Sequence, residues 1–198
     1  MKKIDTLKNN DYTIFNNDKV YKYDGKFWIS KNYDMKKKNY FQWILKRFFD
    51  IFASFIGLIF ISPLLLVIAI LIKLDSEGPV FFKQKRVGYL GETFSMYKFR
   101  TMKVNADKEL EKLKALNQTN EGMFKLFNDP RVTKVGKFLR KYSLDELPQL
   151  YNVLKGEMSL VGPRPPIVKE LETYKPSHFV RFSSLPGITG MWQTSGRS

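Results

Sequence analysis

An uncharged, strongly apolar run from Ile51 to Ile72 restricts the fold of this chain more than any other part of the sequence. About 20 apolar residues are enough to cross the hydrocarbon core of a bilayer, so a helix buried in a water-soluble core is the weaker explanation. Ser62 and Pro63 lie in the middle of the run, where a proline removes a backbone hydrogen bond and kinks a helix. The sequence therefore predicts a membrane segment over residues 43–75 that is broken at Ser62 and Pro63.

Basic residues flank this segment on both sides. They are Lys36, Lys37, Lys38, Lys46 and Arg47 before it, and Lys73, Lys83, Lys85 and Arg86 after it. A spanning helix carries its positive charges mainly on the cytoplasmic side. Equal flanks therefore predict a re-entrant helix pair whose two ends lie on the same, cytoplasmic face. An ordinary single span stays open, because transmembrane helices tolerate proline.

The charge balance of the chain indicates an anionic partner. Lysine and arginine number 34 against 19 aspartate and glutamate, which gives a formal net charge of +15. Nucleic acid, anionic lipid and phosphorylated substrates all fit such a balance, and the charge alone does not choose among them. The chain has no cysteine, which excludes disulfides and thiolate metal sites.

The regions on either side of the membrane segment differ in composition. Residues 1–42 form a polar and aromatic extension, in which alternation around Asp24 and Gly25 predicts a β-hairpin. Residues 76–198 form the predicted cytoplasmic domain. It begins with two short strands around a turn from Gly88 to Gly91 and continues with helices over residues 106–116 and 132–142. No catalytic residue is expected in the N-terminal extension.

Two adjacent acids, Asp145 and Glu146, lie where a helix is expected to begin. Ser143 and Glu146 have the spacing of a capping box, whereas Pro148 suits a start near residue 147, and both starts leave the acids at the positive end of the helix. Acids in a first turn are more often caps than catalysts. Here Arg140 precedes the pair, and we expect its guanidinium to clamp a phosphate.

Several further segments accompany these acids. They are Tyr97-Lys98-Phe99-Arg100-Thr101-Met102, Asp129-Pro130-Arg131-Val132-Thr133, Leu139-Arg140, Ser143 to Leu150, Asn152 to Gly156, Met158 to Pro165, and Pro186 to Gly190. Together with Ser62-Pro63, from about Phe41 to the C-terminus, they resemble the bacterial sugar transferase family of monotopic polyprenyl-phosphate phosphoglycosyl transferases. The resemblance implies transfer of a sugar 1-phosphate from a UDP-sugar to undecaprenyl phosphate with release of UMP, in the first membrane step of exopolysaccharide, capsule or glycoconjugate synthesis.

The resemblance also implies roles for residues around the acidic pair. Asp145 matches the nucleophile that forms an aspartyl-linked phosphosugar, which is a plausible way to divide a displacement between two anions into two steps. Glu146 matches the acid that holds Mg²⁺, the expected cofactor. Arg140 and Lys98 would help at the catalytic centre by screening charge, and Arg100, on the same strand face as Lys98, would contact substrate.

Four other residues are expected to bind substrate. Pro163, Arg164 and Pro165 match the nucleotide-binding turn of the family, although such a turn can also be only a rigid connector. Arg197 lies where the family has another arginine on the substrate side.

The predicted fold is a small α/β membrane-associated, monotopic domain with a re-entrant helix pair, a short sheet and surrounding helices. We expect it on the cytoplasmic face of a bacterial inner membrane, with the bilayer, a UDP-sugar, polyprenyl phosphate and downstream glycosyltransferases as partners, and with no nucleic acid. The family normally continues past the Gly-Arg motif at residues 196–197, so the chain is expected to be truncated. An inactive membrane-bound scaffold is therefore the alternative function. A basic nucleic-acid binder would not explain the broken apolar segment beside an acidic pair.

Overall fold

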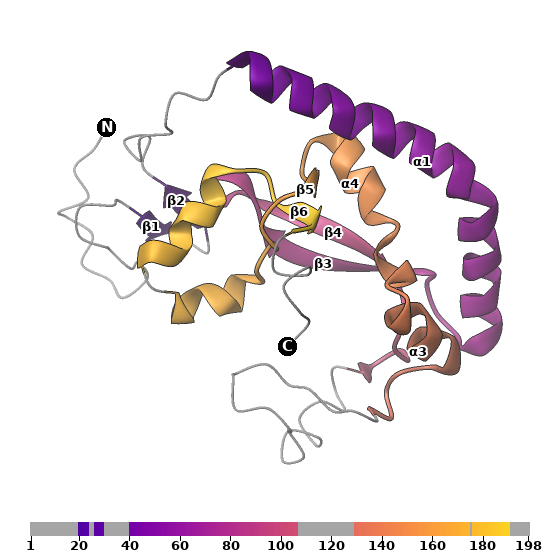
Figure 1. Ribbon diagram of the computed structural model, residues 1–198. Coiled ribbons are helices and arrows are strands. Elements are labelled where there is room, and N and C mark those ends of the chain that lie inside the picture. Colours follow the sequence, from indigo (N-terminus) through magenta and orange to yellow (C-terminus); the bar gives the residue numbers. More distant parts are fainter. Residues whose placement is uncertain (1–19, 24–25, 30–39, 107–128, 175, 191–198) are drawn as a thin grey trace. The chain divides into compact units, whose positions relative to one another are not determined.

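The computed structural model describes residues 20–23, 26–29, 40–106, 129–174 and 176–190, which form a mixed α/β structure of helices and short two-stranded sheets (Figure 1). The chain divides into two compact units. The first unit contains residues 1–55, 84–96 and 150–198, and the second contains residues 56–83 and 97–149. The predicted helix at residues 106–116 lies almost entirely outside the described residues, as does Arg197.

The apolar segment forms one continuous helix, α1, from Tyr40 to Asp75, with Pro63 inside it. The structure thus does not show two separate helices at Ser62 and Pro63, and the re-entrant arrangement stays a prediction. Pro63 cannot donate a hydrogen bond to the carbonyl of Ile59, but the hydroxyl of Ser62 donates to that carbonyl at 2.8 Å. The neighbouring serine thus satisfies the acceptor that the proline leaves unpaired, and the helix continues.

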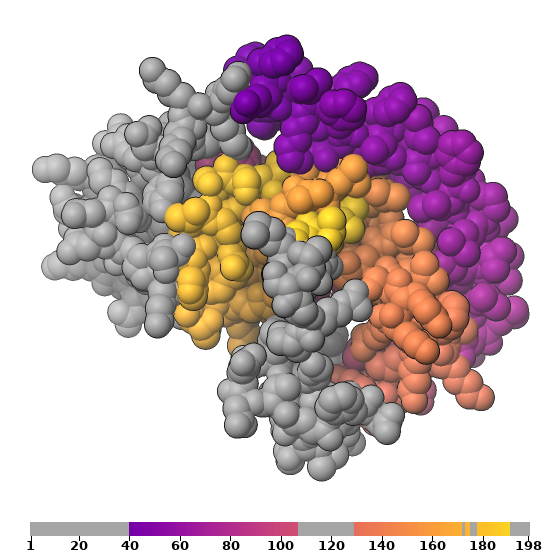
Figure 2. Space-filling model, in the orientation of Figure 1, coloured from indigo at the N-terminus to yellow at the C-terminus, as the bar shows by residue number. Residues whose placement is uncertain are grey.

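Helix α1 is long and apolar enough to cross a membrane, and only 11% of its most apolar window is buried. Its side chains stand at the surface along the length of the helix in the space-filling view (Figure 2). Phe60 is 79% exposed and Leu74 is 80% exposed. A core helix would bury such residues, so the exposure agrees with membrane association.

Both predicted hairpins are present. Strands β1 (Val20–Tyr23) and β2 (Lys26–Ile29) pair antiparallel, with Val20 opposite Ile29. Strands β3 (Phe81–Val87) and β4 (Thr93–Phe99) are hydrogen-bonded to each other, and the short 3₁₀ turn η2 (Tyr89–Gly91) lies between them. The glycines bounding this turn close it, because the backbone N–H of Gly91 donates to the carbonyl of Gly88 at 3.1 Å.

The core of the second unit joins the end of α1 to helix α3 (Lys134–Lys141), which confirms the predicted basic helix. Ile68 and Ile72 of α1 pack with Phe99 and with Leu139 of α3, and all four are buried. The carboxylate of Asp75 accepts a hydrogen bond from the backbone N–H of Val135 at 2.9 Å. The last turn of α1 and the first turn of α3 are therefore fixed to each other by apolar packing and by a hydrogen bond.

The first unit contains α4 (Gln149–Lys155) and a parallel pair of strands, β5 (Ser159–Val161) and β6 (Gly187–Thr189). Two 3₁₀ segments, η5 (Val168–Thr173) and η6 (Pro176–Ser183), lie between these strands in sequence. One apolar cluster contains Val87, Leu171, Phe179 and Phe182, and another contains Met96, Val153 and Met158.

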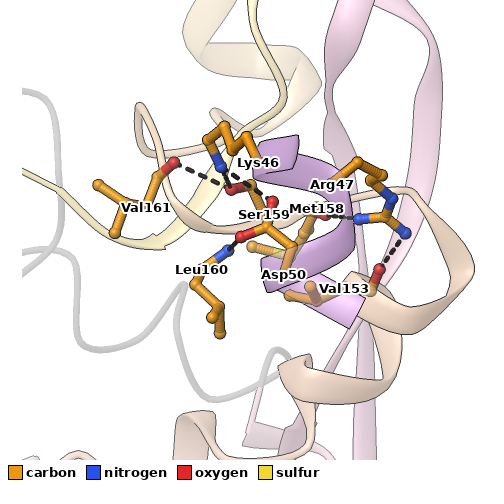
Figure 3. A network of polar contacts seen from close by, with 8 residues as sticks. All are labelled: Lys46, Arg47, Asp50, Val153, Met158, Ser159, Leu160 and Val161. Carbon is orange, nitrogen blue, oxygen red and sulfur yellow. Dashed lines mark hydrogen bonds and ion pairs between the residues drawn. The ribbon is translucent and has the colours of Figure 1, made fainter. Parts of the chain in front are cut away.

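Polar contacts fix the start of α1 to α4 and β5 within the first unit (Figure 3). Arg47 donates to the carbonyls of Val153 at 2.5 Å and Met158 at 3.2 Å. Asp50 accepts from Lys46 at 2.9 Å and from the backbone N–H of Leu160 at 3.2 Å. Asp50 is 4% exposed, so the ion pair with Lys46 compensates a buried charge.

Replacing Gly136 by alanine should destabilise the second unit. A Cβ at this position would overlap the backbone carbonyl of Thr101, against which α3 begins. Overpacking against backbone typically costs about 1–3 kcal/mol, so the Gly136→Ala protein should unfold at a lower temperature in detergent. Lys137→Ala, at the exposed neighbouring position of α3, is the matched control and should leave the midpoint nearly unchanged. Equal midpoints for both variants would contradict this close approach.

Candidate active site

The acidic pair lies in a separate 3₁₀ turn, η4 (Leu144–Glu146), which precedes α4. Of the two predicted helix starts, the capping box at Ser143 is wrong, because Ser143 has a left-handed backbone (φ 57°) and its side chain makes no capping hydrogen bond. Helix α4 begins at Gln149, next to Pro148, which favours the later start. The backbone N–H of Ser143 instead donates to the carbonyl of Arg140 at 3.3 Å, so Ser143 helps to end α3. The acids therefore follow the end of one helix rather than occupying the first turn of the next.

Lys98 contacts both acids of this turn. Its ammonium nitrogen lies 2.8 Å from Oε1 of Glu146 and 4.0 Å from Oδ2 of Asp145. The side chains of Asp145, Lys98 and Glu146 are 13%, 23% and 27% exposed, so water only partly screens these charges. The structure thus brings the predicted lysine to the predicted acids.

Burial raises the pKa of the Asp145 carboxyl above its ordinary value. The positive charge of Lys98 is the largest opposing influence, while the negative charge of Glu146 raises the pKa further and Arg140 lowers it. Because the pKa in the folded chain exceeds that in the unfolded chain, ionised Asp145 lowers the stability of the fold. This loss of stability is absent at pH values below the ordinary carboxyl pKa and is fully present at pH values above the raised pKa of Asp145.

Arg140 belongs to the last turn of α3 and is held by a residue that the sequence did not single out. Its Nε donates to the hydroxyl of Thr101 at 2.9 Å. The bridge between Met102 and Val132 and the bond from Thr133 N–H to the Thr101 carbonyl bring this threonine against α3. Thr101 therefore positions Arg140, and this role becomes visible only once residues 101–102 pair with residues 132–133 in the fold.

The predicted substrate contact at Arg100 has a different set of partners in the structure. The guanidinium donates to the carbonyl of Ser76 at 2.7 Å and also to the carbonyls of Ile72 and Glu77. The residue is 6% exposed. Arg100 caps the carbonyl end of α1, which is a structural function, and its contacts do not support the expectation that it faces a phosphate with Lys98.

The predicted nucleotide turn belongs to the first unit. Pro163, Arg164 and Pro165 follow β5, and Nη1 of Arg164 lies 3.4 Å from Oε2 of Glu170 in η5. Sequence reasoning did not single out this glutamate. A carboxylate in the first turn of a short helical segment was the only local signal for it.

The acidic pair also fits the ligand chemistry of Mg²⁺. Within the described ranges, no group of three or more histidine, cysteine, aspartate or glutamate side chains gathers around a point. Mg²⁺ needs no such cage, because it commonly takes one or two carboxylates together with water and substrate phosphates. Lys98 contacts Glu146 at Oε1.

Comparison with known proteins shows which family this chain resembles. Residues 41–198 match the family described as bacterial sugar transferase. The galactosyl transferase CpsE of Streptococcus agalactiae is 51% identical over 84% of this chain, but that segment is 37% of CpsE. The exopolysaccharide production protein ExoY of Rhizobium meliloti is 47% identical over 77% of this chain and 70% of ExoY. The undecaprenyl-phosphate galactose phosphotransferase of Salmonella typhimurium is 49% identical over 78% of this chain and 33% of its own length.

The chain belongs to the bacterial sugar transferase family, because the family match covers most of its length. It spans only about a third of the length of several of these relatives.

Replacing Lys98 by methionine should raise the pKa of Asp145 further, because Lys98 is the largest influence that lowers it. The carboxyl resonance of Asp145, assigned with Asp145→Asn, can be followed against pH by ¹³C NMR. The matched control is Lys83→Met, which removes another cation of the second unit, one that lies over the ring of Tyr97 at 5.3 Å. A titration that moves equally in both variants, or in neither, would refute the coupling between Lys98 and Asp145.

Proposed function

We propose that this protein transfers a sugar 1-phosphate from a UDP-sugar to undecaprenyl phosphate and releases UMP, as a membrane step in polysaccharide synthesis. The observation that carries the proposal is a largely buried carboxylate, Asp145, beside a second acid and within reach of Lys98. The charge of Arg140 also acts on Asp145. Relatives whose names specify undecaprenyl phosphate and UDP-glucose or galactose support this substrate pair.

In the proposed first step, a carboxylate oxygen of Asp145 attacks the phosphorus that bears the sugar. A new phosphorus–oxygen bond forms, the bond to the bridging oxygen of the diphosphate breaks, and UMP leaves with that electron pair. In the second step, a phosphate oxygen of undecaprenyl phosphate attacks the same phosphorus and displaces the Asp145 carboxylate. Covalent catalysis of this kind divides one displacement between anions into two.

Burial supports this assignment, because a desolvated carboxylate is less stabilised by water and is a stronger base. Lys98 holds positive charge next to both acids, and Arg140 has terminal amino groups suited to a phosphate. These cations would reduce the repulsion between the anionic nucleophile and the diphosphate. Mg²⁺, when bound at Glu146 and the substrate phosphates, would supply further neutralising charge.

We also propose that α1 anchors the protein at the cytoplasmic face of a bacterial inner membrane in a re-entrant, monotopic arrangement. Basic residues on both sides of the apolar run support this topology, because positive charge favours the cytoplasmic side. A lipid carrier keeps its phosphate at the membrane interface, whereas a nucleotide sugar arrives from water. A membrane-anchored domain can meet both substrates.

Asp145→Asn should abolish transfer without destabilising the fold. The amide cannot act as the nucleophile, so UMP release with Mg²⁺, undecaprenyl phosphate and a panel of UDP-sugars should fall about a thousandfold or more. Because ionised Asp145 lowers stability, the variant should be at least as stable as the parent at neutral pH, and this difference should vanish below about pH 4.

Glu77→Gln, an exposed acid of the second unit, is the control and should retain activity. Release that persists in Asp145→Asn would refute the nucleophile. If the parent does not release UMP with any UDP-sugar of the panel, the transferase proposal fails. A non-catalytic, membrane-bound scaffold then becomes the better explanation.

Glu146→Gln should raise the Mg²⁺ concentration that gives half-maximal UMP release. A neutral amide oxygen is a weaker ligand for a hard dication than a carboxylate oxygen. Measuring release against free Mg²⁺ separates this effect from a general loss of rate. Glu157→Gln, which removes an acid paired with Lys155 at 2.6 Å in the first unit, is the control. An unchanged Mg²⁺ dependence in Glu146→Gln would remove Glu146 from the proposed metal site.

A further inference from the structure

In the first unit, after β5, the charges of two arginines and one carboxylate act on the pKa of the Tyr174 phenol. Arg164 pairs with Glu170, and Arg181 contacts Tyr174. Among the described residues, no acidic side chain forms an ion pair with Arg181. This cluster therefore holds more positive than negative charge.

Arg181 is held in place but is not neutralised. Its Nη1 donates to the hydroxyl of Tyr174 at 2.5 Å, and its guanidinium carbon lies 5.1 Å from the centroid of the same ring. Its Nε is buried and has no hydrogen-bond partner in the described part of the chain. The Tyr174 ring contacts Phe179 edge-on and stacks on Phe182, which are both buried. A packed aromatic cluster thus fixes the arginine.

Tyr174 provides no negative charge for Arg181 at neutral pH. Burial is the largest influence on the pKa of its phenol and raises that pKa above the ordinary value, so the hydroxyl stays protonated. A partly buried guanidinium without an anionic partner has an unfavourable desolvation free energy, which a bound anion would offset.

Arg164 is held only weakly by the carboxylate of Glu170. The distance of 3.4 Å from Nη1 to Glu170 is longer than a typical charge-assisted hydrogen bond, and the arginine side chain is 36% exposed. Such a pair can exchange the carboxylate for another anion at small cost. A guanidinium offers five donors in a planar fork that matches phosphate oxygens.

We propose that Arg181 binds, together with Arg164, the phosphate groups of the nucleotide substrate, and that Glu170 holds Arg164 until that anion arrives. Tyr174 is the positioning residue for Arg181. This inference rests on the proposed function, and it adds Arg181, Tyr174 and Glu170 to the predicted nucleotide turn.

Equilibrium binding of UDP to the full chain in detergent tests the proposal independently of turnover. Arg181→Gln should raise the dissociation constant for UDP about tenfold or more, as the loss of charge-assisted hydrogen bonds predicts. Arg181→Lys should recover part of the affinity, because it keeps the charge but not the fork. Lys169→Gln, an exposed cation of η5, is the matched control and should change the constant less than twofold.

Tyr174→Phe separates binding from a purely structural role. It removes the hydroxyl that accepts from Arg181 but keeps the ring that packs in the core. If Arg181 acts on the nucleotide, Tyr174→Phe should weaken UDP binding less than Arg181→Gln does, and thermal unfolding should show both variants folded. Equal weakening in the two variants, or none in Arg181→Gln, would overturn the proposal.

The source of the phosphate is tested by comparing the two substrates. A raised KM for undecaprenyl phosphate in Arg181→Gln, with unchanged UDP binding, would assign the anion to the lipid and overturn the nucleotide assignment. If the parent binds UDP and Arg181→Gln does not, the inference holds even where no sugar is transferred. Failure of the transferase proposal is thus distinguishable from failure of this one.

Discussion

One lysine shared by two neighbouring carboxylates is the interaction on which the site of the second unit depends. Lys98 lies 2.8 Å from Glu146 and 4.0 Å from Asp145. Without a cation, two largely desolvated acids next to each other would repel and take up protons. With it, burial can raise the pKa of Asp145 while positive charge still favours its carboxylate. Lys98 therefore favours the anionic form of Asp145, which the proposed chemistry requires, although burial of the site disfavours that form.

The scaffold around these acids is built where secondary structure elements end. Arg100 caps the carbonyls at the end of α1, and Asp75 in the same region binds the backbone of α3. Gly136 lets α3 begin directly against Thr101, whose hydroxyl then orients Arg140. Ser143 in a left-handed conformation ends α3 and turns the chain into η4. Most of these steps are backbone or capping contacts, and Leu144 and Leu147, on either side of the acids, add packing against the apolar cluster of the second unit.

The sequence predicted local structure well and side-chain partners poorly. The turn at Gly88 and the basic helix of α3 depend on neighbouring residues, and both were confirmed. Helix α1 continues past Pro63 because Ser62 satisfies the freed carbonyl, a detail of rotamer choice that the pattern does not contain. The capping box at Ser143 was wrong because the end of α3 needs that residue in another conformation. The partners of Arg100 lie more than twenty residues away, and only the fold reveals them.

The net charge of +15 overstates how much of the basic surface is available to anions. Arg47 donates to carbonyls of Val153 and Met158, Arg86 donates to that of Pro165 at 3.0 Å, and Arg100 donates to those at the end of α1. These guanidiniums bind main-chain carbonyls at helix ends and in loops. A protein with small sheets thus uses arginine as a backbone partner inside the fold. Arg140, Arg164 and Arg181 differ from these arginines, because their side chains contact a hydroxyl or form a long ion pair rather than binding main-chain carbonyls, which leaves donors for an anionic substrate.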